Sequence, residues 1–381
     1  MRRPRRVMAV ALAAAVVPAL LAGCGSGSSG SSGSGPIKIG WSGPLTTAEA
    51  YFGSTGLRGA QLAVREVRLT GKLAGRRIQL IALDDGGDPA QAVTVAKRFV
   101  SDGVAAVVGP IDSGPMIAAG PIYARANIPT TTTGSNPDII ARAFPDVVQL
   151  IANDVRQGGA MAQYAKEQGI GSVAVFNDSQ SFGQGVAESF ARAARAHGVA
   201  VVADTALSPN TQDYTSAVNE ALAKHPDAIY FGGAVTPGGL LCRQARAAGF
   251  SGLFMGPDGI FDPAFIKGCG SAVGNVAVSF QSPPYDAGGA VTQFAARYRA
   301  AYGSEPGPYS DYGYVQVGFL AAALSKAGST DPKAVNQAMH EVAYDGPLGT
   351  TRVDAHGALV NGPLFIYRAA GGRFAFVREV R

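Results

Sequence analysis

A serine at a strand-to-helix turn is the first candidate for chemistry in this sequence. Ser113 follows residues 104–112, where a Val-rich apolar run indicates a strand buried on both faces and a Gly-Pro pair ends it. The helix that begins there points free amide groups and the positive end of its dipole toward the strand's carboxyl edge. A carboxylate or phosphate would be stabilised at that edge by backbone N–H groups and by the Ser113 hydroxyl. The alternative is that Ser113 only caps the helix.

Residue types that enzymes use for catalysis are present but not arranged for it. The four histidines lie far apart, mostly at predicted helix ends or loops, where a helix dipole explains them: His197, His225, His340 and His356. There is no Gly-x-Ser-x-Gly motif, no Gly-x-x-x-x-Gly-Lys-Ser/Thr loop and no Gly-x-Gly-x-x-Gly after the first strand. Asp84, Asp85 and Asp88 suggest a cation site, but a solvated turn with a helix cap also explains them. We therefore expect binding rather than catalysis, with no metal and no cofactor.

Alternating strand and helix patterns must position the Ser113 turn. Strands are predicted at 37–41, 77–83 and 129–133, helices at 56–68 and 89–101, and the stretch 104–119 supplies a further strand and helix. Asp88 and Pro89 are typical of a helix N-cap and first helical position. Strands and helices that alternate with short connectors predict a doubly wound parallel sheet.

A second series of the same kind follows, without short tandem repeats. Helices are predicted at 157–168, 183–197, 214–224 and 236–248, with strands at 172–177, 199–204, 228–232, 253–255 and 276–280. Later helices at 290–301, 312–326 and 332–342 and a terminal hairpin of 363–368 and 373–380 remain after it. A length of 381 residues fits about two domains. The leftover helices indicate a chain that crosses back between two hinged lobes.

The N-terminus predicts export and anchoring. Four Arg within residues 2–6 precede a short apolar stretch at 7–20, and Leu21-Ala22-Gly23-Cys24 resembles the lipobox at which bacterial lipoproteins are cleaved and lipidated. The apolar stretch is too short for an ordinary membrane-spanning helix. We expect a signal peptide over residues 1–23, a lipid on Cys24, and a Gly/Ser tether over 24–36. The body would then be extracytoplasmic and anchored to the outer face of the cell membrane.

Charge and cysteine content constrain the partners of the body. The net charge of +5 includes four Arg of residues 1–23, and without them it falls to +1. A nucleic-acid binder would need a basic stripe on the body, so we expect no nucleic-acid partner. Cys242 and Cys269 either pair, as an exported compartment allows, or remain two buried free thiols, because spacing alone does not show whether their side chains meet.

Nine motifs, in order, carry a family resemblance. They are Ile37-Lys-Ile-Gly with Gly43-Pro-Leu, Arg58-Gly-Ala-Gln-Leu-Ala-Val, Asp84-Asp with Asp88-Pro, Val107-Val-Gly-Pro-Ile-Asp-Ser-Gly-Pro, Ser135-Asn-Pro, Tyr230-Phe-Gly-Gly, Arg243-Gln-Ala-Arg, Phe254-Met-Gly-Pro-Asp-Gly and Glu305-Pro-Gly-Pro-Tyr. Over residues 36–381 the chain resembles the substrate-binding lipoproteins of branched-chain amino-acid ABC transporters, of the leucine/isoleucine/valine-binding type.

The resemblance implies the α/β fold of type I periplasmic binding proteins, with two doubly wound parallel-sheet lobes and a three-segment hinge. We place the crossings near Ile151, Gln281 and His356. The N-terminal lobe would comprise residues 37–151 and 282–356, and the C-terminal lobe residues 152–281 and 357–381.

The resemblance also implies a site for a zwitterion. Ser113 and Ser135 would hold the ligand carboxylate, while the Thr133 carbonyl, the Ser135 hydroxyl and Asp258 would hold its ammonium group. Ser135 stands where the family often has Thr, and Asp258 where the archetype has Glu. The matching side-chain pocket positions are Phe52, Ile111, Asp112, Phe182, Ala234 and Tyr309. The ligand would bridge the lobes, because Ser113 and Asp258 fall on different ones.

The predicted function is therefore that of a monomeric receptor that captures an amino acid, branched-chain or related, and delivers it to the permease subunits of an ABC transporter. The alternative is a sensing receptor of the same fold for an amide, urea-like or other small polar molecule, not coupled to transport. A sugar or nucleoside receptor would be expected to stack its ligand on aromatic faces and to have less use for paired Ser and Asp ligands.

Two departures from the archetype bear on specificity. Ala234 replaces a Tyr and Asp112 replaces a Cys, so more room and a carboxylate would favour a longer, polar or cationic side chain. The alternative is that Asp112 points away and caps the helix at residues 114–116, which leaves Phe52 and Phe182 to form an apolar pocket.

Overall fold

The structure is a computed structural model that describes residues 35–208, 211–270 and 273–380. The predicted signal peptide, Cys24 and nearly all of the predicted tether lie outside the described residues. Among the helices that are described, none combines the length and the apolar character needed to cross a membrane.

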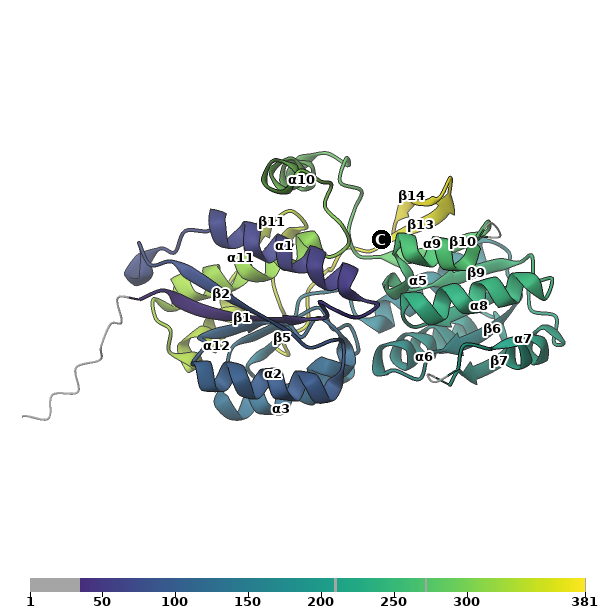
Figure 1. The fold of residues 1–381 in the computed structure, drawn as a ribbon, viewed down its shortest axis with the longest axis horizontal. Coiled ribbons are helices and arrows are strands. Elements are labelled where there is room, and N and C mark those ends of the chain that lie inside the picture. The colour runs from purple at the N-terminus through teal and green to yellow at the C-terminus, as the bar shows by residue number, and fades with distance from the viewer. Residues whose placement is uncertain (1–34, 209–210, 271–272, 381) are drawn as a thin grey trace, which may run out of the picture. The chain divides into compact units, whose positions relative to one another are not determined.

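The first sheet has five parallel strands in the order β2-β1-β3-β4-β5. They are β1 (Ile37–Gly43), β2 (Ile78–Asp84), β3 (Ala106–Val108), β4 (Thr130–Thr132) and β5 (Val147–Gln149). Figure 1 shows α1 (Ala50–Glu66) and α11 (Ser310–Ala327) on one face, and α2 (Pro89–Asp102) and α3 (Ser113–Ala126) on the other. We call this sheet and its helices, with α10 (Gly289–Tyr302) and α12 (Pro332–Glu341), the first lobe.

Neighbouring residues of one strand divide between the two faces of this sheet. Ala106 and Val108 of β3 pack in the core beneath α1 and α11, while Val107 packs in the core beneath α2 and α3. All three are fully buried. This is the pattern of a parallel strand covered on both sides, and it explains the continuous apolar run before Ser113.

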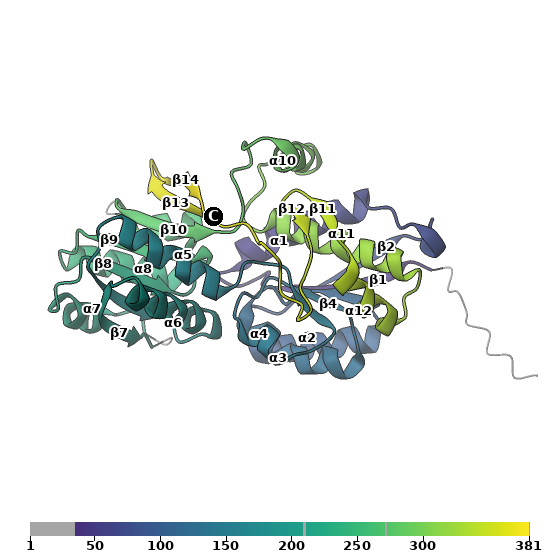
Figure 2. The same cartoon turned by 180° about the vertical axis from the view of Figure 1, so that it is seen from behind.

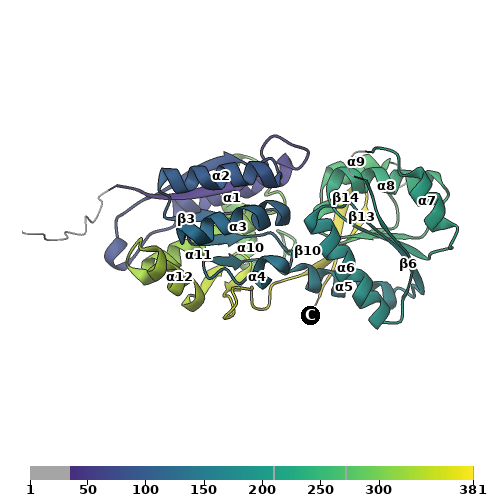
Figure 3. The ribbon, with the colours of Figure 1, turned by 90° about the horizontal axis from the view of Figure 1, so that it is seen from below.

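The second sheet has seven strands in the order β14-β13-β10-β9-β8-β6-β7. The parallel strands are β6 (Ser172–Asn177), β7 (Ala200–Ala206), β8 (Ala228–Gly232), β9 (Leu253–Gly256) and β10 (Val276–Phe280), and β13 (Phe365–Ala370) with β14 (Arg373–Glu379) form an antiparallel hairpin at one edge. Figure 3 shows α5 (Asp154–Glu167) and α6 (Ser181–Ala196) on one face, and α7 (Thr215–Leu222), α8 (Val235–Ala247) and α9 (Pro263–Cys269) on the other. We call this sheet and its helices the second lobe. The predicted pair of doubly wound parallel sheets is confirmed.

Several elements differ from the sequence-based prediction. Helix α1 begins at Ala50 rather than at residue 56. Short elements were not predicted: β5, α4 (Asp138–Ala141), α9, the 3-10 turns Gly71–Leu73 and Asp258–Ile260, and the hairpin of β11 (Tyr344–Gly346) and β12 (Gly349–Thr351). That hairpin contacts α11 and is seen from behind in Figure 2. Elements of three to seven residues, such as these, carry too little periodic pattern to be recognised.

Close packing explains the unexpected start of α1. A Cβ atom at Gly53 would lie 1.6 Å from the carbonyl oxygen of Pro44, and one at Gly59 would lie 1.7 Å from that of Ser310 in α11. Glycine disfavours helix in isolation. Here glycine allows the helix to approach the neighbouring backbone, so tertiary contact overrides local propensity.

The chain passes between the two sheets three times. It leaves the first sheet after β5 and leaves the second after β10. The third passage lies later than the position predicted near His356, because the strand-like segment there is bonded to β5: Gln149 donates to the Gly357 carbonyl at 2.8 Å, and Leu359 donates to the Gln149 carbonyl at 3.0 Å. The chain joins the second sheet only at Leu364, whose carbonyl accepts from Val380.

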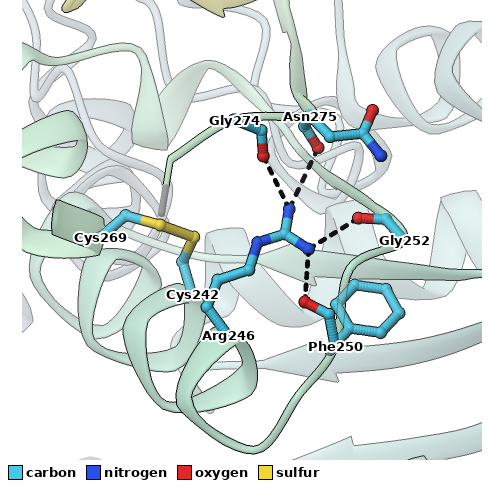
Figure 4. The surroundings of a disulfide bond; sticks show 7 residues. All are labelled: Cys242, Arg246, Phe250, Gly252, Cys269, Gly274 and Asn275. Atoms are coloured by element: carbon cyan, nitrogen blue, oxygen red, sulfur yellow. Dashed lines mark hydrogen bonds between the residues drawn. A yellow bond between two sulfur atoms is a disulfide. The ribbon is translucent and has the colours of Figure 1, made fainter. Parts of the chain in front are cut away.

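Cys242 and Cys269 form a disulfide, which was one of the two interpretations left open by the sequence. The bond joins α8 to the end of α9, with a Cα–Cα distance of 5.1 Å (Figure 4). One turn further along α8, Arg246 donates hydrogen bonds to the carbonyls of Phe250, Gly252, Gly274 and Asn275. The disulfide and Arg246 together tie α8 to the segments that flank β9.

Candidate functional site

A cavity of about 40 Å³ lies between the two lobes. Its lining comes mainly from the loops that follow β1, β3, β4, β6, β8 and β9, so it lies where the carboxyl ends of both sheets meet. The structure brings all ten predicted ligand-contacting residues together there. The full lining is Glu49, Phe52, Ile111, Asp112, Ser113, Thr133, Gly134, Ser135, Phe182, Ala234, Asp258, Gly259 and Tyr309.

Ser113 is the first residue of α3 and is 1 % exposed. Its hydroxyl accepts a hydrogen bond from the amide of Asn136 at 3.1 Å, so it holds the loop after β4 against the helix start. Gly134 permits this approach, because a Cβ atom there would lie 3.1 Å from the Ser113 Cα. The amides at the start of α3 and the Ser135 segment thereby face the same cavity, which is an arrangement suited to an anion.

Asp112 occupies the N-cap position of α3, but its side chain makes no capping hydrogen bond. The alternative in which Asp112 points away and caps the helix is therefore wrong. The carboxylate lines the cavity instead, and its Oδ2 is buried without a hydrogen-bond partner in the part of the chain that the structure describes.

Asp258 lies in the 3-10 turn after β9 and is 3 % exposed. Its Oδ2 accepts hydrogen bonds from the Tyr309 hydroxyl and, at 3.2 Å, from Gln281 Nε2. Its Oδ1 is buried and has no partner among residues 35–208, 211–270 and 273–380. Burial raises the pKa of Asp258, and the hydrogen bonds oppose that rise. One oxygen is thus held in place while the other can accept from a ligand donor.

Hydrogen bonds join the lobes beside the cavity, and one of them runs from the Asp154 amide at the start of α5 to the Ser135 carbonyl at 3.0 Å. Tyr309, immediately before α11 in the first lobe, donates to Asp258 in the second. Asn136 Nδ2 in the first lobe donates to the carbonyl of Ser181 at the start of α6, at 2.7 Å. The lobes are therefore in contact around a cavity with room for about one water molecule. A ligand of amino-acid size requires the lobes to separate and close again.

Glu49 lines the same cavity and was missed by the sequence analysis. It directly precedes α1, and the predicted start of that helix at residue 56 left it in a connecting loop. Burial raises the pKa of Glu49 to about 7, and the nearby negative charges of Asp178 and Asp85 contribute to the rise. Burial also raises the pKa of Asp112 well above its usual range, and the negative charges of Glu49, Asp85 and Asp258 add to this effect. An acid just before a helix near the first strand was the available signal, but only packing shows that it faces Asp112.

The chain is similar in sequence and in structure to known binding proteins. Residues 36–373 match a family model described as periplasmic binding protein. An amino acid binding protein of Pseudomonas aeruginosa is 32 % identical over 87 % of this chain and 89 % of its own length, and the Leu/Ile/Val-binding protein BraC3 of Rhizobium johnstonii is 31 % identical over 80 % and 83 %. The crystal structure of the leucine binding protein LivK of Thermotoga maritima superposes with a TM-score of 0.85 at 27 % identity, covering 90 % of this chain and 98 % of that one.

This chain belongs to the Leu/Ile/Val-binding protein family of periplasmic binding proteins. Its fold is the type I periplasmic binding-protein fold, as the resemblance implied. Members of the family bind substrates and are not enzymes, which agrees with the absence of a catalytic motif in the sequence. Membership also identifies this binding protein as extracytoplasmic.

The acidic turn of this periplasmic binding protein is occupied by structural hydrogen bonds. Asp84 accepts from the amides of Leu45 and Gly86, and Asp85 accepts from Ser42 Oγ at 2.5 Å. Asp88 caps α2 through the Gln91 amide at 2.7 Å, which confirms the predicted cap. Within the described ranges, no group of three His, Cys, Asp or Glu side chains is suited to a metal ion.

Proposed function

We propose that this protein captures an amino acid between its lobes, outside the membrane, and delivers it to the permease of an ABC transporter. The observation that carries the proposal is the pairing of a helix start at Ser113 with the unpartnered oxygen of Asp258 in one cavity. An amino acid presents one carboxylate and one ammonium group. A helix N-terminus and a buried carboxylate match those charges through charge-assisted hydrogen bonds.

Each head-group contact can be assigned to an atom. The ligand carboxylate would accept from the Ser113 hydroxyl and from amides near Ser135. The ammonium group would donate to Asp258 Oδ1, to the Thr133 carbonyl and to the Ser135 hydroxyl. The side chain would then extend among the remaining predicted pocket residues. Support comes from the shared lining of one cavity by all of these residues.

Calorimetry with a panel of L-amino acids tests the head-group assignment. Ser135→Ala is expected to weaken binding of the best amino acid by about 1–3 kcal/mol, since it leaves a buried charged group short of a hydrogen bond. Asp258→Ala is expected to weaken it at least as much. Ser101→Ala and Asp138→Ala alter exposed residues of the first lobe and serve as matched controls. Wild-type affinity in both Ser135→Ala and Asp258→Ala would place the site elsewhere.

Lobe closure has a separate test. The ligand would contact Ser113 on one lobe and Asp258 on the other, so binding should favour the closed arrangement. Small-angle scattering is expected to show a smaller radius of gyration with saturating amino acid than without it. An unchanged radius of gyration would contradict a ligand that bridges the lobes.

Membrane attachment is assigned to Cys24, since lipidation of this residue would anchor the protein beside its permease. Cys24→Ser is expected to release the protein from the membrane fraction of the native host. Continued retention of processed Cys24→Ser protein in that fraction would refute Cys24 as the required anchor.

A further inference from the structure

We propose that the amino acid bound by this protein carries a second positive charge on its side chain, received by the carboxylates of Glu49 and Asp112. This proposal rests on the proposed function, because it assumes that Ser113 and Asp258 hold the head group. The chemical class of ligand is a basic amino acid, of the kind that ends in an amine or a guanidinium group.

Glu49 and Asp112 converge on one place in the cavity. Both line it, from the loop before α1 and the loop before α3. A Cβ atom built at Gly87 would lie 3.1 Å from Glu49 Oε2 and 3.7 Å from Asp112 Oδ2, so the two carboxylates approach the same point. Gly87 has a positive φ of 70° and no side chain to separate them. Two carboxylates at one position form a receptor for a single cationic group.

Among the residues that the structure describes, no Lys, Arg or His forms an ion pair with Glu49 or Asp112. None of the cavity-lining residues that the structure describes is Lys, Arg or His. The ion pairs found among the described residues lie at the surface and involve neither Glu49, Asp112 nor Asp258. Buried carboxylates without a partner cation are unfavourable, and they either keep a proton or take a positive charge from a ligand.

The charge of the ligand side chain determines whether the carboxylates of Glu49 and Asp112 have a positive partner. In the proposed site Asp258 is neutralised by the ligand ammonium group, while the ligand carboxylate is held by the start of α3. An aliphatic amino acid would leave Glu49 and Asp112 without any positive partner. A basic amino acid brings one additional positive charge to the end of the cavity where these two carboxylates lie.

Closure of the lobes depends on the same charges. Asp178 belongs to the second lobe, where its Oδ2 accepts from the amide of Ala234 at 2.9 Å. It is the nearby charge that acts most strongly on Glu49 of the first lobe. Bringing the lobes together therefore brings carboxylates toward each other across the cleft. A ligand cation between the lobes would favour the closed state, and a neutral side chain would not.

There is room beyond Ala234 for a long side chain. Ala234 lines both the site and a neighbouring cavity of about 530 Å³, whose polar lining includes Asp178, Gln180 and Arg243. The apolar rings of Phe52 and Phe182 line the site itself and suit the methylene stem of a basic side chain. A small residue at position 234 therefore places no bulky side chain between the site and this neighbouring cavity.

Two matched ligand pairs test the proposal on the unaltered full-length protein. Arginine and citrulline have nearly the same shape and differ in charge, and lysine and norleucine differ by the terminal amine. Calorimetry at about pH 8 is expected to show the charged member of each pair binding roughly tenfold tighter or more, because Glu49, with a pKa of about 7, is then largely ionised.

Variants then assign the preference to the two carboxylates. Glu49→Gln and Asp112→Asn should each weaken arginine binding by roughly tenfold and citrulline binding by less, so that the ratio of the two affinities falls. Glu188→Gln removes an exposed acid of α6 and should change neither. Circular dichroism shows whether each variant is folded, and a smaller preference of a folded variant for arginine over citrulline supports the proposal.

The outcomes separate this proposal from the proposed function. If norleucine or leucine binds as tightly as lysine, and citrulline as tightly as arginine, the second charge is refuted while an amino-acid receptor stands. If no amino acid binds, the proposed function fails first. Agmatine, which is arginine without its carboxylate, is expected to bind weakly. Equal affinity for agmatine would overturn the amino-acid head group and with it this proposal.

Discussion

Replacement of Glu49 by Gln is expected to stabilise the ligand-free protein, by an amount that grows as the pH rises from about 4.5 to about 7 and is constant above that. The pKa of Glu49 rises from 4.5 to about 7 on folding. Between these values the folded protein keeps a proton that the unfolded chain has lost, so stability falls as the pH rises through this window. Above about pH 7 the ionised carboxylate is half-buried near Asp178 and Asp85, and the full cost of its ionisation is present.

The magnitude follows from the shift. A pKa difference of this size corresponds to about 3 kcal/mol in the free energy of unfolding. Partial solvent exposure of Glu49 reduces the expected effect to about 1–3 kcal/mol. For a protein of this size, each kcal/mol raises the melting temperature by about 2 °C. Glu49→Gln is therefore expected to melt about 2–6 °C above wild type near pH 8, and to differ much less near pH 5.

Thermal unfolding followed by circular dichroism at the two pH values provides the assay. Glu188→Gln removes an exposed acid of α6 and should show no pH-dependent gain. If Glu49→Gln gives no gain near pH 8, or the same gain at both pH values, then Glu49 is solvated in solution. The lobes would then not bring it close to Asp178, and the electrostatic reasoning would be refuted.

Three further predictions concern contacts that position the site. Tyr309→Phe keeps the ring against Phe52 but removes the hydrogen bond to the buried carboxylate of Asp258 across the cleft. Amino-acid affinity measured by calorimetry should therefore fall by about 1.5–3 kcal/mol. An unchanged affinity would contradict a role for this bond in the closed state. Cys242→Ser should lower the free energy of unfolding in urea by about 2–5 kcal/mol, and a reductant should then have no further effect on the variant. Gly59→Ala should lower the melting temperature, because its Cβ would lie 1.7 Å from a backbone oxygen of α11. Gly159→Ala on α5 is the control and should not lower it, because a Cβ atom there meets nothing within 4 Å. Equal melting temperatures of the two variants would show that α1 and α11 pack less closely than described.

Local sequence signals were sufficient where an element is determined by its own residues. The Asp88-Pro89 pair placed the start of α2 correctly, because an N-cap and a first-position proline act within one turn. The strands β6, β8 and β10 have the predicted bounds, since each is a continuous apolar run between turn residues. These strands and helices establish the two parallel sheets.

Ten of the 13 residues that line the cavity were predicted from the sequence through the family resemblance. Motif positions such as Ser113, Ser135 and Asp258 follow the ends of parallel strands, and parallel strands direct their carboxyl ends to a common edge. The positions of the motifs after successive strands were therefore enough to predict that the ten residues lie in one cavity. The role of each residue in binding stays a prediction for the experiments above.

Only the tertiary structure decided which acids face one another. Glu49 and Asp112 are far apart in the sequence and approach each other because the loops after the neighbouring parallel strands β1 and β3 leave the sheet at the same edge. The hydrogen bond from Tyr309 to Asp258, and the unpartnered second oxygen of Asp258, likewise depend on how two lobes meet. Charge sign is a property of each residue, but its pKa and its partners are properties of its surroundings. Distant segments supply those surroundings only after the chain has folded.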